Sequence, residues 1–349
     1  MGRGVRRALG KAEVAWWLTR FYLNNGALLM IAAGWVGATD GTWRTAQFVW
    51  AMLFMAASSS AILVFNDVSD HEDDKVTAPH MPLAAGLMEV RTAAVFGAAL
   101  ALLGVVFLAL ASVDTERFLI CVGLLVLATA SGVVYSAAKP LGIVASVLVG
   151  LPFAIVPLLG WVAAGGQAEV AAALLAAYGF VDGHTANTQA ALKDVDVDPL
   201  VGNRTLAVRI GPLRAFRFAT AVGSLAWFVV AALNAIEGAE PVSLVLLSAS
   251  VVLTVAILPR TYRSFQEADR GRELRVDDLA FLKIGDYLRN VALVAVYAPA
   301  LAVGLGLLFQ PILIVGRRLY VRRIVQGELA RSLGVAPAPA GPVQPAVGS

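Results

Sequence analysis

The sequence has few of the residues on which soluble enzymes and zinc sites depend. Its 349 residues include one cysteine and three histidines. Charged residues make up 15%, where a soluble domain carries about 25%. The single cysteine, Cys121, excludes an internal disulfide. The low charge, the 59% of hydrophobic residues and a mean hydropathy of +0.76 together indicate a polytopic membrane protein.

Two further features are missing. The apolar segment from Trp16 to Gly37 is long enough to span a membrane and is followed by no convincing small-residue cleavage site, so no signal peptide is expected. No segment alternates like a barrel strand, so each span is predicted to be a helix, which satisfies its own backbone hydrogen bonds. The net charge of +3 comes from Lys and Arg in short segments between apolar runs, which indicates topology and no nucleic-acid partner.

Apolar runs of about 20 residues, the length that a helix needs to cross a lipid bilayer, recur along the chain. They predict nine transmembrane helices, over residues 16–37, 45–65, 91–111, 117–135, 142–164, 168–190, 214–235, 241–258 and 288–313. Spans one to four and five to eight form a coarse repeat. The predicted fold class is therefore all-α: a polytopic membrane protein with two pseudo-repeated four-helix halves around a central cavity.

The distribution of Lys and Arg predicts the orientation. The first, third, fifth and seventh connections contain only Arg44 and Arg117, whereas the N-terminal segment and the other connections contain most of the rest. By the positive-inside rule, the N-terminus and the second, fourth, sixth and eighth connections are cytoplasmic. A functional site built on these connections opens to the cytoplasmic side of the cell membrane. Nine spans would place the C-terminus outside, although the last span is followed by Arg317, Arg318, Arg322, Arg323 and Arg331.

The chain is predicted to form one membrane domain over residues 1–313. A basic segment follows over 314–334, and an Ala/Pro/Gly tail over 335–349 has the composition of a disordered segment. The connection over 259–289 is unusually long and suits a lid.

Two clusters of carboxylates begin where long apolar runs end, each after the second span of its half. Asp67, Asp70 and Asp74 are spaced i, i+3 and i+7, so a helix that continues past the membrane boundary presents them on one face and turns Asp73 aside. The second cluster pairs Asp194 with Asp198 at i, i+4 and turns Asp196 aside. Two halves that face each other would bring the clusters together over the cavity.

The spacing of the carboxylates predicts bound cations. Carboxylates on one face repel one another at low dielectric unless a cation lies between them. Oxygen ligands with no cysteine nearby and only scattered histidine favour Mg²⁺ over zinc. Magnesium usually bridges carboxylates to phosphate oxygens, so two facing clusters imply two Mg²⁺ ions and a diphosphate. The alternative is that each cluster is only solvated charge at a helix end.

Several segments resemble the UbiA superfamily of intramembrane prenyltransferases. The segment over 202–211 resembles the stretch after the family's second motif, and the segment over 74–86 is most similar to the homogentisate and plant-type aromatic branch. The segments that resemble the two aspartate motifs and the YxxxK element are Asn66-Asp67-x-x-Asp70-x-x-x-Asp74, Asp194-x-x-x-Asp198 and Tyr135-Ser136-Ala137-Ala138-Lys139.

This resemblance implies a reaction and a set of site residues. A prenyl diphosphate would be ionised to an allylic carbocation, which an acceptor captures. Lys139 would contact the diphosphate, with Tyr135 beside it, and both would take part in catalysis. The magnesium ligands would be Asn66, Asp67, Asp70 and Asp74 for one ion, and Asp194 and Asp198 for the other.

Polar side chains within a predicted span are functional candidates, because ionisable groups are costly in a membrane. Asp182 and His184 lie in the sixth predicted span, a few turns before Asp194, and Asn187 lies between them and the cluster. Asp182 or His184 could orient or deprotonate the acceptor. The alternative is a hydrogen bond between helices.

Three functions stay open from the sequence. The leading hypothesis is a Mg²⁺-dependent prenyltransferase that joins a prenyl group to an aromatic acceptor. The second is a UbiA-type terpene cyclase, which ionises the same donor without an acceptor. The third is a non-enzymatic transporter or scaffold with the same fold, in which the two aspartate motifs would have no evident use.

Overall fold

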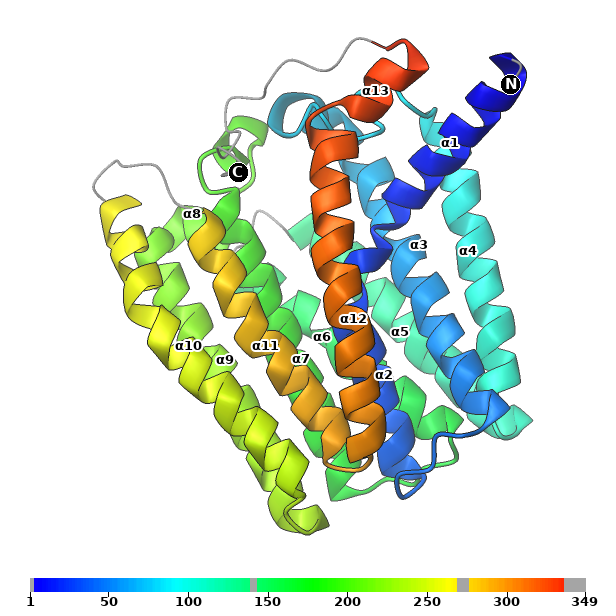
Figure 1. Ribbon diagram of the computed structural model, residues 1–349, viewed down its shortest axis with the longest axis vertical. Helices are drawn as coiled ribbons and strands as arrows, with labels where there is room; N and C mark the ends of the chain where they lie inside the picture. The colour runs from blue at the N-terminus through cyan, green and yellow to red at the C-terminus, as the bar shows by residue number, and fades with distance from the viewer. Residues whose placement is uncertain (1–2, 139–142, 269–275, 336–349) are drawn as a thin grey trace. The chain divides into compact units, whose positions relative to one another are not determined.

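The computed structural model describes residues 3–138, 143–268 and 276–335, and in these ranges the chain forms helices and turns without a strand (Figure 1). The predicted all-α class is confirmed. In chain order the principal helices are α1 (Arg3–Thr19), α2 (Asn25–Ala38), α3 (Ala46–Thr77), α4 (Val90–Ala111), α5 (Thr115–Ala138), α6 (Ile143–Ala163), α7 (Val170–Lys193), α8 (Leu206–Ile210), α9 (Pro212–Glu237), α10 (Pro241–Ala268), α11 (Val276–Ala295), α12 (Pro299–Tyr320) and α13 (Glu328–Leu333). Three short elements join them: η1 (Phe21–Leu23), η3 (Asp198–Val201) and the π-helical η4 (Val321–Val325).

The chain divides into two compact units, and each is built from segments that are far apart in the sequence. Unit 1 combines residues 1–25, 53–107 and 307–349, and unit 2 combines residues 26–52 and 108–306. They do not correspond to the two consecutive four-helix halves that the repeat predicts, so those halves are not confirmed.

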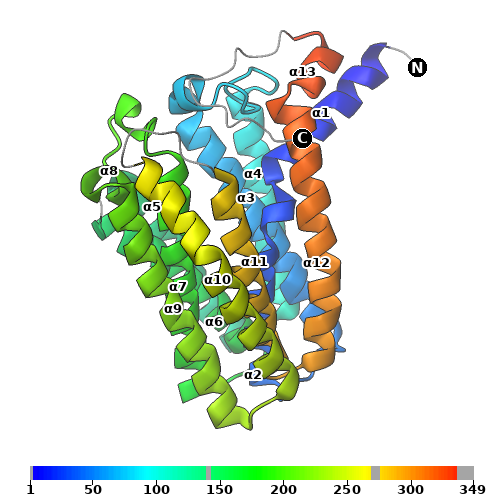
Figure 2. The same ribbon diagram turned by 60° about the vertical axis from the view of Figure 1, so that its left-hand side comes forward.

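Unit 2 is a helical bundle in which neighbours in sequence are neighbours in space. α5 packs on α6, α6 on α7, α7 on α9, and α9 and α11 on α10 (Figure 2). Gly34 of α2 lies so close to α6 that an added Cβ would stand 1.9 Å from the carbonyl oxygen of Pro157. Helices in lipid gain little from burying apolar surface against one another, so small residues that permit close backbone approach become important.

Unit 1 gathers the N-terminal helix, α3 from Leu53 onward, most of α4, and α12 from Leu307 with η4 and α13. Its apolar core contains Trp17 and Leu18 of α1, Val64 of α3, Leu83 of the α3–α4 connection and Ile324 of η4. The two ends of the chain therefore pack within the same unit.

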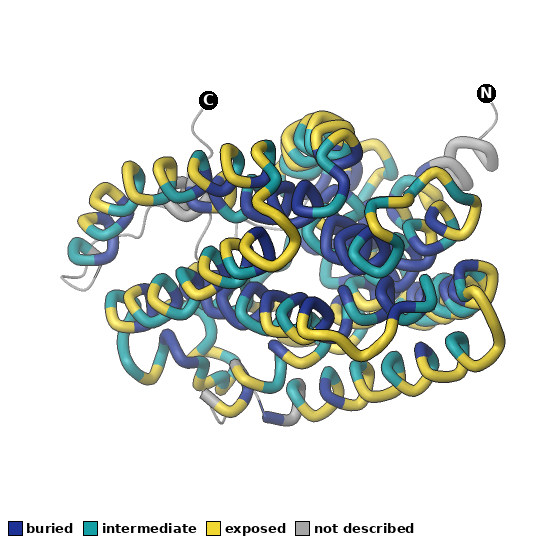
Figure 3. The backbone as a smooth tube through the Cα atoms, turned by 90° about the horizontal axis from the view of Figure 1, so that it is seen from below, coloured by how far each residue is buried: buried dark blue, intermediate teal, exposed yellow. Residues whose placement is uncertain are grey.

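The outer faces of the helices suit a lipid environment. Figure 3 shows exposed residues along the outward sides of the helices and buried residues along the inward sides. Large apolar side chains such as Val95, Leu102, Leu119 and Val245 are exposed, as expected where lipid takes the place of water. The chain is an integral membrane protein.

The predicted count of nine spans is not confirmed. Within the described ranges, six helices are long and apolar enough to cross a membrane, or seven if a bent pair over 10–23 and 25–38 counts as one span. This pair replaces the straight first span predicted over 16–37. It bends by 57°, and Arg20 adopts the left-handed conformation there, with φ of 43°.

The last predicted span, over 288–313, is wrong, because that range contains the end of α11 and most of α12. The chain reverses between Ala295 and Pro299, where proline has no N–H to continue the α11 hydrogen-bond pattern. The predicted connection over 259–289 is largely helical, since α10 continues to Ala268 and α11 begins at Val276. Only residues 269–275 between them lie outside the described ranges.

The division of the last predicted span into α11 and α12 bears on the side of the C-terminus. The predicted domain boundary at residue 313 falls inside α12. Beyond it, Arg323 forms two hydrogen bonds with Glu13 of α1, at 2.6 and 2.7 Å. Arg323 therefore lies beside the N-terminal segment, and the two ends of the described chain are next to each other within unit 1. The tail over 336–349 lies outside the described ranges.

Candidate active site

The first aspartate cluster lies on a continuous helix, as predicted. α3 runs through the cluster to Thr77 and ends before Pro79, which cannot extend it. Asp67 is buried, Asp70 and Asp74 are half-buried, and Asn66 and Asp73 are exposed. The face that carries the three spaced aspartates is thus the one that turns inward.

Arg20 contacts the most buried of these carboxylates. Its Nη2 donates a hydrogen bond to Asp67 Oδ1 in a close ion pair within unit 1. The other carboxylate oxygen, Oδ2, is buried and has no hydrogen-bond partner in the structure, and the same holds for Arg20 Nε. A buried unpaired carboxylate oxygen is a suitable ligand for a hard cation. The donor set of this cluster therefore fits Mg²⁺.

Besides Asp67, the surroundings of Arg20 include residues of the α3–α4 connection and of α12. Met81 Sδ lies 3.9 Å from its Nη2, and Tyr320 Oη of α12 lies 3.2 Å from the same sulfur. In the α3–α4 connection, burial and, secondarily, the Arg20 charge hold the pKa of His80 below its ordinary value.

The second aspartate cluster is not on one helix, which corrects the prediction. α7 ends at Lys193, Asp194 is its C-terminal cap, and Asp198 begins the short η3. Asp and Val are weak helix formers, and Pro199 disfavours the helical conformation at the residue before it. The i, i+4 relation survives as a turn, because the Asp198 N–H donates to the Asp194 carbonyl at 2.8 Å.

The turn also holds the Asp198 side chain. Thr205 Oγ1 donates a hydrogen bond to Asp198 Oδ2 at 2.8 Å, and the Asn203 N–H donates to the Asp198 carbonyl at 2.9 Å. Asp194 and Asp196 are exposed. The segment after the second cluster thus fixes one of its two predicted ligands.

Of the two residues predicted to act in catalysis from the YxxxK element, the structure describes only Tyr135. Tyr135, near the end of α5, donates a hydrogen bond from its hydroxyl to Asn187 Oδ1 of α7 at 3.0 Å. This contact places Tyr135 against the polar part of α7. Lys139 lies outside the described residues.

Neither cluster is a complete metal site by itself. Where the structure describes the chain, no three Asp, Glu, His or Cys side chains form a group that could hold a metal ion. Asp67, Asp70 and Asp74 belong to unit 1, and Asp194 and Asp198 to unit 2. The meeting of the two clusters therefore stays a prediction.

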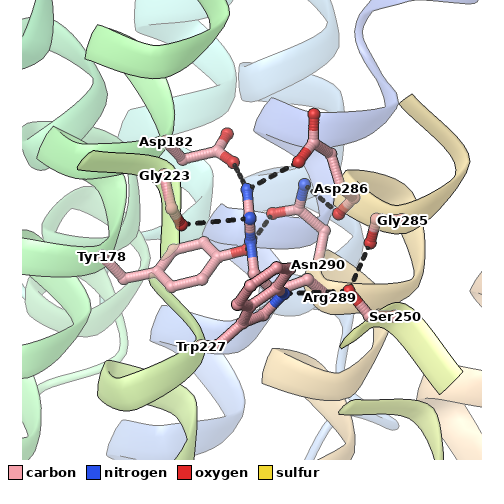
Figure 4. Close-up of polar contacts among 9 residues, drawn as sticks. All are labelled: Tyr178, Asp182, Gly223, Trp227, Ser250, Gly285, Asp286, Arg289 and Asn290. Carbon is pink, nitrogen blue, oxygen red and sulfur yellow. Dashed lines mark hydrogen bonds and ion pairs between the residues drawn. The ribbon is translucent and has the colours of Figure 1, made fainter. Parts of the chain in front are cut away.

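Asp182 lies in a buried polar network inside unit 2 (Figure 4). Arg289 Nη2 of α11 contacts Asp182 Oδ1 at 2.6 Å and Asp286 Oδ1 at 3.2 Å. Arg289 Nε donates to Tyr178 Oη at 3.2 Å, and that hydroxyl donates to Asn290 Oδ1 at 2.9 Å. Asp182 thus makes the contact between helices that was the alternative to an acceptor role. His184 is also buried, with its ring edge-on to Phe218 at 5.5 Å.

Sequence reasoning missed Arg20 and Arg289 as functional candidates and counted both as topology signals. Both lie inside predicted spans, 16–37 and 288–313. The rule that flagged Asp182, that an ionisable residue within a span is a candidate, would have found them as well. Their partners Asp67 and Asp182 lie 47 and 107 residues away along the chain, so spacing does not indicate them; Asp286, by contrast, is three residues from Arg289.

Comparison with known proteins finds relatives of this chain in sequence and in fold. A digeranylgeranylglyceryl phosphate synthase from Sulfurisphaera tokodaii is 29% identical over 198 residues, which cover 56% of this chain and 68% of that protein. A UbiA homologue from Archaeoglobus fulgidus, solved with DMAPP and Mg²⁺, superposes with a TM-score of 0.61 at 19% identity, covering 84% of this chain and 98% of that one. A UbiA homologue from Aeropyrum pernix gives a TM-score of 0.55 at 19% identity, with 81% and 97% covered.

These similarities extend over most of the membrane domain. The structural neighbours share the fold, and the UbiA prenyltransferase family model matches residues 27–284, which include both aspartate clusters. The resemblance seen in the sequence motifs is confirmed. The chain belongs to the UbiA prenyltransferase family and is a prenyltransferase.

Proposed function

We propose that this prenyltransferase transfers the prenyl group of a prenyl diphosphate to an aromatic acceptor in a Mg²⁺-dependent reaction, with its site open to the cytoplasmic side. The observation that carries the proposal is the inward face of α3, where Asp67 keeps one buried carboxylate oxygen unpaired beside Asp70 and Asp74. The relatives solved with DMAPP or GPP together with Mg²⁺ support this choice of donor and metal.

The first half of the proposed reaction is ionisation of the prenyl diphosphate. The C–O bond of the donor breaks, its electron pair stays on the diphosphate oxygen, and an allylic carbocation remains. Bound Mg²⁺ would supply charge that stabilises the leaving diphosphate. The ligands that we propose for two ions are Asn66, Asp67, Asp70 and Asp74 for one and Asp194 and Asp198 for the other, while Lys139 binds the diphosphate and Tyr135 positions it.

The second half needs a dry cavity and an acceptor. An acceptor carbon attacks the carbocation and then loses a proton, and water must be excluded because it would quench the cation. We propose that Asp182 orients the acceptor rather than removing its proton, since its carboxylate is already bound by Arg289.

The acceptor class rests on two observations. The segment over 74–86 resembles the aromatic branch of the family. Among the described residues, the one arginine of the buried network in unit 2, Arg289, is also shared by Asp182 and Asp286, so it is not free to bind an anionic acceptor. A prenylglyceryl phosphate is the second candidate, because the relative from Sulfurisphaera tokodaii is named a digeranylgeranylglyceryl phosphate synthase.

The purified full-length chain can be tested against donors and acceptors together. Prenyl diphosphates of increasing length are incubated with Mg²⁺ and with a phenolic acid, with a prenylglyceryl phosphate, or with no acceptor. We expect a prenylated aromatic product, which disappears in excess EDTA and returns with added Mg²⁺. A product only with the glyceryl phosphate would replace the aromatic acceptor, and a hydrocarbon formed without acceptor would indicate a cyclase.

A further inference from the structure

α12 approaches the partners of Arg20 from outside the part of the chain that matches the family model. Arg20 precedes, and Tyr320 follows, the residues 27–284 that match the family model. Both residues nevertheless contact Met81 in unit 1. Met81 Sδ lies 3.2 Å from Tyr320 Oη and 3.9 Å from Arg20 Nη2. The ring of Tyr320 also lies 6.0 Å from Trp17 and 5.7 Å from Tyr22, which flank Arg20 in sequence.

The segment over 316–333 contacts α1 and η1 at three further points. Arg323 binds Glu13 through two hydrogen bonds, and Glu13 also accepts one from Trp17 Nε1 at 3.2 Å. Gly316 lies so close to Tyr22 that an added Cβ would be 2.4 Å from the Tyr22 Cβ, and the same test at Gly10 finds Leu333 at 2.3 Å. The end of α1, and with it the position of Arg20, is fixed by the segment over 316–333.

Arg20 is presented to Asp67 by an unusual backbone. It adopts φ of 43° and ψ of 38° where α1 gives way to η1, a conformation that side-chain-bearing residues rarely adopt. The guanidinium pairs with a single oxygen of Asp67, and one buried polar atom stays unpaired on each partner. The pair is therefore close but incomplete, which suits a contact that is exchanged during binding.

We propose that Arg20 is the counter-ion of Asp67 in the metal-free enzyme, held there by the C-terminal segment over 316–333, and that it competes with magnesium for this carboxylate. The proposal rests on the proposed function in that Asp67 is taken to be a magnesium ligand. Arginine stays protonated, so a metal on Asp67 must displace a full positive charge. A half-buried guanidinium that loses its carboxylate favours another anion. Metal binding then depends on the arrival of the diphosphate, which makes the two binding events cooperative.

Binding of Mn²⁺, followed by its electron paramagnetic resonance signal in the purified full chain without donor, tests the competition. Arg20→Gln is expected to bind Mn²⁺ roughly tenfold more tightly than the wild type, and to lose most of the gain in affinity that inorganic pyrophosphate gives the wild type. Arg20→Lys keeps the charge and should resemble the wild type. Arg91→Gln removes one exposed arginine from the same unit and serves as the matched control.

A second pair of variants tests the role of the C-terminal segment. Arg323→Gln breaks the contact with Glu13 and should shift Mn²⁺ affinity in the same direction as Arg20→Gln, whereas Arg318→Gln, an exposed neighbour on α12, should not. Thermal unfolding of each variant identifies any that fails to fold.

Two results separate this proposal from the proposed function. Unchanged or weaker Mn²⁺ binding in Arg20→Gln, with binding lost in Asp67→Asn, would overturn the counter-ion role alone. Unchanged Mn²⁺ binding in Asp67→Asn would instead remove Asp67 from the metal site and with it the basis of the proposed function.

Discussion

Single carboxylates on α3 differ sharply in their surroundings although they are close in sequence. Asp67 is 4% exposed and paired with Arg20, whereas Asp73, less than two turns later, faces outward. Their spacing allowed this distinction to be predicted, because a helix turns residues six apart to different sides. The identity of the partner, Arg20, was not predictable, since it depends on a bend that brings the end of α1 to α3.

The first prediction compares Asp67 with Asp73. Asp67→Asn should reduce turnover of prenyl diphosphate by at least about a hundredfold, because it removes charge from the developing leaving-group site. It should also lower the free energy of unfolding by about 1–3 kcal/mol, because Arg20 loses its charged partner. Steady-state kinetics and unfolding in detergent measure the two effects. Asp73→Asn, on the same helix, should stay close to wild type, and an equal loss in both variants would contradict the assignment.

Helices of unit 2 are held together by interior polar contacts as well as by packing. The Arg289 side chain is 2% exposed and joins α7, α9 and α11 through Asp182, the Gly223 carbonyl and Asp286. In lipid, an isolated charge of this kind would be very costly, so each member of the network depends on the others.

The second prediction concerns this network. Arg289→Met should destabilise the protein by about 3–5 kcal/mol, because it leaves two interior carboxylates without a cation. Asp182→Asn keeps a hydrogen-bond acceptor and one carboxylate for Arg289, so it should cost less. Chemical unfolding in detergent gives the comparison. Lys283→Met, exposed on the same helix, is the control, and a similar cost for Lys283→Met and Arg289→Met would argue against an interior ion network.

The third prediction concerns the approach of α2 to α6. In Gly34→Ala the new methyl group would meet the Pro157 carbonyl at 1.9 Å, so the helices must separate. The free energy of unfolding should fall by about 3 kcal/mol. Gly123→Ala on α5 meets nothing within 4 Å and should be neutral. Thermal unfolding distinguishes the two, and equal midpoints would contradict the tight helix crossing.

Element boundaries show where sequence reasoning succeeds and where it fails. The length and apolarity of α4, α5 and α9 follow from local composition, and their predicted ranges agree with the structure within a few residues. The division between α11 and α12 was missed, because the apolar run continues through Tyr297 and Ala298 and conceals the turn before Pro299. The end of α7 was missed because the i, i+4 spacing of Asp194 and Asp198 fits both a helix and a turn.

At the scale of the whole molecule, the division into two units follows contacts that no local pattern reports. The predicted repeat assumes that neighbours in sequence form one half, yet unit 1 joins the first 25 residues to residues beyond 306. Specific side chains make this connection, chiefly Glu13 with Arg323 and Tyr22 with Tyr320. Pairs so distant in sequence have no spacing signal, so the side of the C-terminus could not be predicted from the count of apolar runs.

The last prediction concerns the side of the membrane on which the C-terminus lies. The single cysteine of the chain makes a labelling experiment practical. Cys121 is fully buried, so a Cys121→Ala background allows one labelling site to be added at a time. Ser332→Cys on α13 lies beside the N-terminal helix. Glu116→Cys lies in the first turn of α5, directly after the predicted membrane crossing of α4. In sealed vesicles, a membrane-impermeant maleimide should label these two sites from opposite faces, with Ser332→Cys labelled on the cytoplasmic face as the positive-inside rule requires. Labelling of both from one face would return the C-terminus to the outer side, as nine spans would have it, and would mean that α11 and α12 do not both cross the membrane.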